Sequence, residues 1–313
     1  MNIKHSVLLN FMFQNNTNLR PTLGLLSGAI VWGLMWYPLR VFLGWGIEGP
    51  LASIMIYGLG IFLPAVFARI SWQELRKNFL LLIIIGIVAG GANLGFILAV
   101  IHGQVMRVVL LFYLAPVWTV LFARIFLRET LKPAGYVLMA LAIFGAVFML
   151  WRPQLGMPFP QNISEWLALI SGVFFALMNV LSRKIADLDY ALRSSVICAG
   201  VFLVGVVVFL IYGHAVKIDV PVLGWLFIVA VGCLVSGSNI LVQYGLTYTV
   251  ANQAILIFLV ELVVAGISSW LLAGEVMSFH EWIGGSCIVS AGVLSYIFPF
   301  NQPLDLPVRT AQD

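Results

Sequence analysis

Ten long apolar segments follow one another along this chain of 313 residues. A helix needs roughly 20 apolar residues to cross a hydrocarbon core of about 30 Å, so each segment suits one membrane crossing. Only 9% of the residues are charged and 62% are hydrophobic, which excludes an ordinary water-soluble domain. The sequence therefore predicts an all-α membrane protein with ten transmembrane helices, in which the lipid bilayer is the main solvent.

Glycine, proline and charged clusters divide the chain into two groups of five predicted helices. The first group comprises Thr22–Leu43, Pro50–Arg69, Asn78–Val100, Val105–Phe126 and Ala134–Trp151. The second comprises Glu165–Ile185, Leu192–Gly213, Leu223–Leu246, Ala251–Ala273 and Trp282–Phe298. We expect an uncleaved polar tail over residues 1–19, a first repeat over 20–152, a linker over 153–163, a second repeat over 164–299 and a tail over 300–313.

The distribution of lysine and arginine predicts how the chain is oriented, because cytoplasmic connections carry an excess of both. Of the sixteen, four lie opposite the N-terminus and the other twelve lie on its side; the four are Arg40, Arg107, Arg152 and Lys217. Both termini are therefore expected to be cytoplasmic, in a multi-pass protein of a bacterial-type inner membrane. The basic residues are scattered and form no dense patch, which argues against nucleic acid as a partner.

The two groups of five helices are similar in sequence. Six residues of the third and fourth helices recur 146 positions later, in the pairs Gly86 and Gly232, Gly91 and Gly237, Asn93 and Asn239, Leu110 and Leu256, Phe112 and Phe258, and Glu129 and Glu275. Because five crossings is an odd number, the second group must enter the membrane from the opposite face. The chain is thus predicted to hold two inverted five-helix repeats, a plan that recurs in secondary transporters.

Each repeat has a fourth helix that leads into a glutamate shortly before the fifth helix. The segments are Ala115-Pro116 with Leu127-Arg128-Glu129-Thr130-Leu131, and Glu261-Leu262 with Ala273-Gly274-Glu275-Val276. The fifth helices carry spaced glycines, at Gly135, Gly145, Gly284, Gly285 and Gly292. In these features the chain resembles, from Leu19 to Phe298, the EamA-type permeases of the drug/metabolite transporter superfamily. The resemblance implies a substrate pathway between the halves, lined largely by the first, third and fourth helices of each repeat.

The second repeat departs from that pattern, because Leu262 replaces the proline that Pro116 provides in the first and is preceded by Glu261. Glu261 is an acidic residue in the middle of an apolar segment, where insertion scales assign charged groups a cost of about 2.5–3.5 kcal/mol. One interpretation is a proton- or cation-responsive group in the pathway, which makes Glu261 the candidate for proton coupling. The other is a protonated side chain that ties two helices together.

Several uncharged polar side chains are candidates for substrate binding. Ser236, Asn239 and Gln243 recur at helical spacing on one face of the eighth helix, and we expect that face to point away from lipid. Asn93 and Asn179 add further amides. Such groups suit a zwitterionic or hydroxylated substrate, and they equally serve as hydrogen bonds between helices.

Aromatic side chains complete the predicted site. Trp32 and Trp36 lie one turn apart within the first helix, and Tyr113 lies within the fourth. Aromatic faces can hold an amphipathic substrate or attract an ammonium group, while packing or contact with lipid is the alternative for each residue.

The rival class is an intramembrane enzyme, which would require clustered acids, histidines or an activated nucleophile. The four histidines map to the N-terminal tail or loops, and the chain carries no HExxH or Walker A motif, so we predict no enzyme, metal or cofactor. The three cysteines lie in apolar segments, without paired ligand spacing.

We therefore expect a permease that exports a small metabolite, such as an amino acid or a related compound, by alternating access. Protons are a further candidate partner. Import of a vitamin, a nucleoside-like cofactor or an amine is the alternative, and a non-transporting scaffold or receptor is the alternative of another class.

Overall fold

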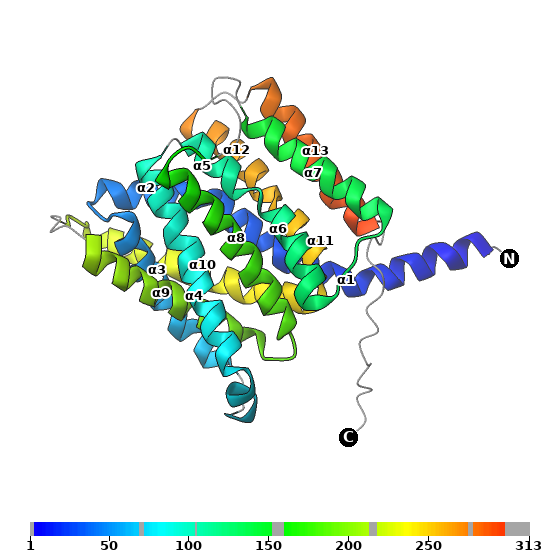
Figure 1. Ribbon diagram of the computed structural model, residues 1–313, viewed down its shortest axis with the longest axis horizontal. Helices are drawn as coiled ribbons and strands as arrows, with labels where there is room; N and C mark the ends of the chain where they lie inside the picture. The colour runs from blue at the N-terminus through cyan, green and yellow to red at the C-terminus, as the bar shows by residue number, and fades with distance from the viewer. Residues whose placement is uncertain are drawn as a thin grey trace.

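The computed structural model describes residues 3–68, 72–103, 105–151, 160–212, 218–274 and 278–297. In these ranges every regular element is helical, as Figure 1 shows. The first repeat contains α1 (Ile3–Leu34), α2 (Trp36–Gly44), α3 (Gly49–Phe67), α4 (Trp72–His102), α5 (Val105–Phe112), α6 (Ala115–Phe122), the π-helix η1 (Ala123–Leu127) and α7 (Pro133–Leu150). The second contains α8 (Ile163–Lys184), α9 (Tyr190–Tyr212), α10 (Val222–Tyr248), α11 (Ala251–Phe258), α12 (Val260–Ala273) and α13 (Phe279–Ile297).

These helices give the predicted number of membrane crossings. Nine segments of the described chain are long and apolar enough to span a bilayer, and they run from Leu19–Gly44 to Ala251–Leu272. Helix α13, with 19 residues, lies along α7 and supplies the tenth. The helical start of α1 at Ile3 means that the segment expected to be a polar tail continues the first helix outward.

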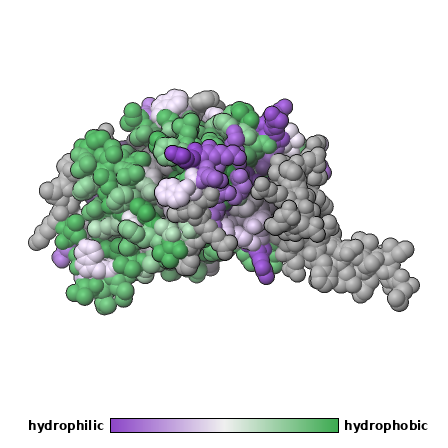
Figure 2. Space-filling view, turned by 90° about the horizontal axis from the view of Figure 1, so that it is seen from below, coloured by the Kyte–Doolittle hydropathy of each residue, from purple (hydrophilic) through white to green (hydrophobic). Residues whose placement is uncertain are grey.

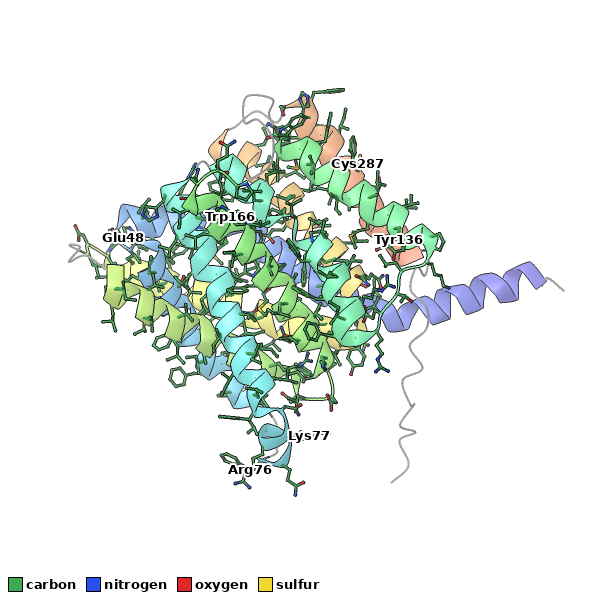
Figure 3. The ribbon with its side chains drawn as sticks, viewed as in Figure 1. Glu48, Arg76, Lys77, Tyr136, Trp166 and Cys287 are labelled. Carbon is green, nitrogen blue, oxygen red and sulfur yellow. The ribbon has the colours of Figure 1, made fainter. Side chains whose placement is uncertain are left out.

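The outer surface of the described chain is apolar, as a bilayer requires. Large apolar side chains stand exposed on many helices, among them Phe62, Val66, Leu210, Val222 and Leu226. Figure 2 shows one face covered mainly by hydrophobic residues, with hydrophilic residues gathered in one region. In Figure 3, Glu48 lies at the left of the view and Arg76 and Lys77 lie at the bottom.

The two repeats are interlocked through equivalent contacts. Helix α1 packs against α10, α11 and α12 of the second repeat, and its counterpart α8 packs against α4, α5 and α6 of the first. In the same way α3 packs against α10, and α9 packs against α4. Each of these contacts between the repeats is thus matched by a contact between the equivalent helices with the repeats exchanged. Two repeats related by a twofold axis are expected to pack in this way.

Close contact between the repeats depends on glycine at one crossing in particular. A Cβ atom added to Gly200 of α9 would lie 2.1 Å from the carbonyl oxygen of Gly86 on α4. Two backbones approach so closely only where both residues lack side chains, in the way that small residues permit in membranes. Gly86 is one of the residues that the repeat pairs with the second half, at Gly232.

Three predicted helices are discontinuous rather than single. The first crossing breaks at Met35 between α1 and α2, the fourth at Tyr113 and Leu114 between α5 and α6, and the ninth at Leu259 between α11 and α12. The hydropathy of these segments is uninterrupted, so the sequence predicted continuous helices there. The breaks of the fourth and ninth crossings occupy equivalent positions, because Tyr113 and Leu259 are 146 residues apart.

Candidate functional site

Proline favours the break in the fourth crossing. Pro116 follows the start of α6 and has no N–H to donate to the Phe112 carbonyl four residues earlier. That carbonyl faces α8, where a Cβ atom at Gly172 would lie only 2.5 Å from its oxygen. Glycine at position 172 thus makes room for the backbone that Pro116 displaces.

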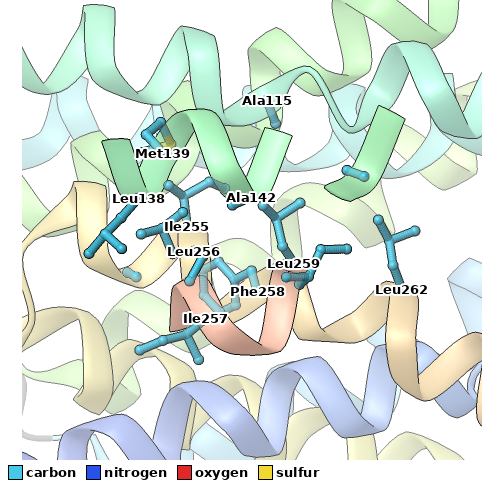
Figure 4. Close-up of a cluster of buried hydrophobic side chains, with 14 of the residues drawn as sticks. Ala115, Leu138, Met139, Ala142, Ile255, Leu256, Ile257, Phe258, Leu259 and Leu262 are labelled. Carbon is cyan, nitrogen blue, oxygen red and sulfur yellow. The ribbon is translucent and has the colours of Figure 1, made fainter. Parts of the chain in front are cut away.

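The ninth crossing breaks without proline. At Leu259 the hydrogen-bond pattern tightens, because the N–H of Leu262 bonds to the Leu259 carbonyl at 3.1 Å, three residues earlier rather than four. Residues 254–259 and Leu262 are all buried, and Figure 4 shows several of these side chains near Leu138, Met139 and Ala142 of α7. Tertiary packing therefore accounts for this break.

The two breaks meet at one polar contact. Tyr113, in the first break, forms a side-chain hydrogen bond with Glu261, the second residue of α12. The phenol hydroxyl donates and the carboxyl oxygen accepts. Discontinuous helices in membranes leave backbone and side-chain polar groups free near the bilayer midplane, which is where transporters bind their substrates.

Aromatic rings extend from this pair. Tyr113 contacts Phe112 edge-on, with ring centroids 5.3 Å apart. Phe112 lies 5.6 Å from Phe175 of α8, which lies 5.9 Å from Phe258 of α11. We call Tyr113, Glu261, Phe112, Phe175 and Phe258 the central site. Phe112 and Phe258 are equivalent residues of the two repeats, so the site lies where the repeats face each other.

The tryptophans and Asn93 make contacts outside this set. Trp32 stacks on Tyr57 of α3, and the Asn93 amide donates to the Tyr57 hydroxyl at 3.4 Å while it accepts from Ser53 at 3.1 Å. The Asn93 amide therefore forms hydrogen bonds between helices, which is the alternative to substrate binding for this residue.

Trp36 lies nearer to the helix that bears Glu261. Its indole N–H donates to the Ser268 hydroxyl of α12 at 2.9 Å. Gly33, on the same helix as Trp32, is packed so closely on α12 that an added Cβ would lie 2.8 Å from the Glu261 carbonyl oxygen. Helix α1 thus forms one wall beside the start of α12.

The polar stripe of α10 is turned away from lipid, as expected, but it faces α9. Ser236 and Gln243 are buried, and the Asn239 amide lies 3.8 Å from the Cys198 sulfur. The Gln243 side chain and carbonyl accept from the Arg193 guanidinium of α9. Two of the three residues in the stripe contact α9 side chains. Within the part of the chain that the structure describes, none of the three forms a hydrogen bond with Tyr113 or Glu261.

Asn179 lies beside the aromatic part of the central site. Its amide nitrogen donates to the Phe175 carbonyl at 2.9 Å, whereas its buried amide oxygen has no partner among the described residues. Asn179 joins Tyr113 and Glu261 as a predicted residue whose surroundings suit a binding role. The roles of all nine predicted site residues stay predictions.

The structure contains a charged cluster at the end of α10 that the sequence did not predict. Glu129 accepts from the Ala251 N–H at 3.1 Å and lies 3.8 Å from the Arg183 guanidinium. Burial raises the pKa of the Glu129 carboxyl, and the Arg183 charge and the N–H groups of Ala251 and Asn252 oppose that rise. Glu129 thus caps α11 of the other repeat, and its repeat counterpart Glu275 lies outside the described residues. The sequence did not predict that Glu129 is buried, because its burial depends on an unusual turn of the chain.

Two interlocked repeats whose broken helices meet at a half-buried carboxyl define a multi-pass membrane protein of transporter architecture. The model of the EamA-like transporter family matches residues 20–151 and again residues 162–297, and the chain belongs to this family. Its family is one of transporters rather than of enzymes.

Two transporters and one solved structure show what this chain is similar to. An uncharacterized transporter of Archaeoglobus fulgidus is 25% identical over 201 residues, which cover 64% of this chain and 69% of that protein. The uncharacterized transporter PA0485 of Pseudomonas aeruginosa is 27% identical over 116 residues, and the match spans 36% of either protein. A solved crystal structure has the same fold, with a TM-score of 0.72 over 88% of this chain and 96% of that one, at 16% identity.

Proposed function

We propose that this protein is a secondary transporter that exports a small metabolite, an amino acid or a related compound, across the inner membrane by alternating access. The observation that carries the proposal is the meeting of the two helix breaks at Tyr113 and Glu261. A site built half from each repeat changes its exposure when the repeats move relative to each other.

The chemistry of the central site favours a substrate with an ammonium group. Glu261 supplies a carboxylate, and Phe112, Phe175 and Phe258 supply aromatic faces that attract cations. When no ammonium group is bound, a proton can occupy the carboxylate, because an ionised and unpaired acid is costly inside a membrane. Glu261 is therefore proposed as both the substrate's counter-ion and the proton-responsive group.

Counterflow into proteoliposomes tests the proposal. Vesicles loaded with an unlabelled amino-acid mixture are diluted into medium that contains trace labelled amino acids. Transient accumulation of label, absent from vesicles without protein, is the expected result. Accumulation only when vitamins, nucleosides or simple amines replace the amino acids would move the proposal to that substrate class.

Thermal stability supplies an independent readout, because a ligand that binds only the folded state stabilises it by mass action. Transported amino acids should raise the midpoint of thermal unfolding in lipid nanodiscs. If none of these metabolites gives counterflow or raises the midpoint of thermal unfolding, that result would contradict a transporter of small metabolites. It would favour a scaffold or receptor.

A further inference from the structure

The charged cluster at the end of α10 begins with an unusual turn of the chain. The fourth crossing ends in the π-helix η1, and the next residue, Arg128, adopts a left-handed conformation with φ of 57°. The Glu129 N–H then bonds back to the Ala123 carbonyl at 3.2 Å. Left-handed backbone is uncommon outside glycine, so this turn is held by its surroundings. Its effect is to bury Glu129 against the second repeat.

Glu129 and Arg183 hold the junction of α10 and α11 from both sides. Glu129 meets the N–H groups at the start of α11, and Arg183 donates to the Leu246 and Thr247 carbonyls at the end of α10. A negative charge at a helix start and a positive charge at a helix end both complement the helix dipole. The ion pair between Glu129 and Arg183 joins the two interactions across the repeat boundary.

A second arginine keeps its bonds within the second repeat. Arg193 of α9 is fully buried, and it donates to the Ser182 carbonyl of α8 and to Gln243 and Thr247 of α10. Helices α8, α9 and α10 are thus tied to one another without help from the first repeat. If the repeats separate at this end, the contacts of Glu129 are among those that must break, together with the cation–π contact between Lys184 and Phe126.

One neighbouring residue lacks the partners that its burial requires. Asn252, the second residue of α11, is 1% exposed, and both of its amide atoms are without a hydrogen-bond partner among the described residues. Buried polar groups are normally paired, and an unpaired one calls for an explanation. A second state of the transporter in which this amide is paired or hydrated supplies one.

We propose that Glu129 and Arg183 form a latch that closes the pathway between the two repeats at this end of the membrane and releases α11 once in each transport cycle. The inference rests on the proposed function, because only a cycle of alternating access requires release. Helix α11 leads directly into the break at Leu259 and on to Glu261, so its release also moves one wall of the central site.

Thiol labelling tests the latch without any substrate. In a full-length background with Cys198, Cys233 and Cys287 replaced by serine, Ala254→Cys places a reporter on the buried side of α11. The protein is held in lipid nanodiscs, where both faces are open to a membrane-impermeant maleimide. Adding Glu129→Gln should speed labelling by about tenfold or more, because the lost ion pair no longer favours the closed state.

Matched variants separate a latch from general loosening. Glu48→Gln removes an exposed carboxylate elsewhere and should leave the labelling rate unchanged. Ala142→Cys, fully buried in α7, should stay unreactive when Glu129→Gln is added. Arg183→Gln removes the other partner and should act in the same direction as Glu129→Gln.

Two results would overturn the latch. One is unchanged labelling at Ala254→Cys in both Glu129→Gln and Arg183→Gln, and the other is equal acceleration at Ala142→Cys, which would mark ordinary destabilisation. If counterflow fails while labelling behaves as expected, Glu129 and Arg183 still hold α11 closed, but the proposed transport activity, and with it release in each transport cycle, is rejected. Intact counterflow with unchanged labelling would reject the latch alone.

Discussion

The fourth crossings of the two repeats reach the same shape by different chemistry. In the first repeat Pro116 removes a backbone donor, and the displaced Phe112 carbonyl packs on Gly172. In the second repeat Leu262 takes the equivalent place, and α11 and α12 separate within a tightly packed apolar cluster. A local residue, Pro116, favours the break in the first repeat, whereas in the second repeat tertiary packing alone accounts for it.

This difference places the polar groups of the central site. The position equivalent to Tyr113 is Leu259, and the position equivalent to Ala115 is Glu261. Each repeat therefore contributes one polar side chain, the first a phenol and the second a carboxylic acid, and the two pair across the boundary. The two crossings share a backbone shape but differ in side-chain chemistry, so the central site is asymmetric between the repeats.

The largest effect is expected from filling the space beside the proline-induced break. Gly172→Ala would press a methyl group on the Phe112 backbone, which cannot move aside, and should destabilise the protein by about 3 kcal/mol. Gly28 is the equivalent residue of the first repeat, because Ser27-Gly28 recurs as Ser171-Gly172 at an offset of 144 residues. Gly28→Ala meets the Val242 side chain instead and should cost less. Thermal unfolding in nanodiscs checks the order, with Gly237→Ala, which meets nothing within 4 Å, as control. An equal loss of stability in Gly28→Ala and Gly172→Ala would contradict the proposed difference between the two repeats.

A smaller effect is expected from removing the phenol hydroxyl. Tyr113→Phe keeps the ring contacts and leaves Glu261 without its donor, which should cost about 1–2 kcal/mol in stability or substrate binding. The exposed Tyr37→Phe serves as the matched control. Stability and substrate affinity that both equal those of the parent protein would show that the Tyr113–Glu261 bond contributes nothing.

The smallest effect is expected at the proline itself. Pro116→Ala restores a backbone donor, but the second repeat breaks without proline, so surrounding contacts should maintain the break. We expect a change in unfolding free energy within about 0.5–1 kcal/mol and unchanged reactivity of a reporter cysteine at Thr119. A large stabilisation, as for a newly continuous helix, would mean that Pro116 alone causes the break.

The sequence predicted the membrane crossings and their duplication because both follow from residue type and spacing. It missed the breaks at Met35, Tyr113 and Leu259, since apolar segments look alike whether their helices are continuous or not. Pro38 after Met35 and Pro116 after Tyr113 are local signals of two of these breaks, whereas no proline lies in α12 after Leu259.

The candidate site was predictable only in part. Glu261 stood out because a charge inside an apolar segment needs a reason, and Tyr113 was chosen for its aromatic ring. Their pairing depends on how two breaks face each other, which no spacing encodes. The Ser236, Asn239 and Gln243 stripe showed the reverse, because amphipathic spacing identified the protein-facing side of α10 but could not say that α9 covers it.

The most direct measurement is flux driven by an imposed pH gradient in proteoliposomes that contain the parent protein, Glu261→Gln or Glu48→Gln. We predict that the gradient accelerates flux of the counterflow substrate in the parent protein and in Glu48→Gln, and that Glu261→Gln loses this acceleration. Gradient-driven flux through Glu261→Gln equal to that of the parent protein would contradict a central role for the carboxylate where the two repeats meet.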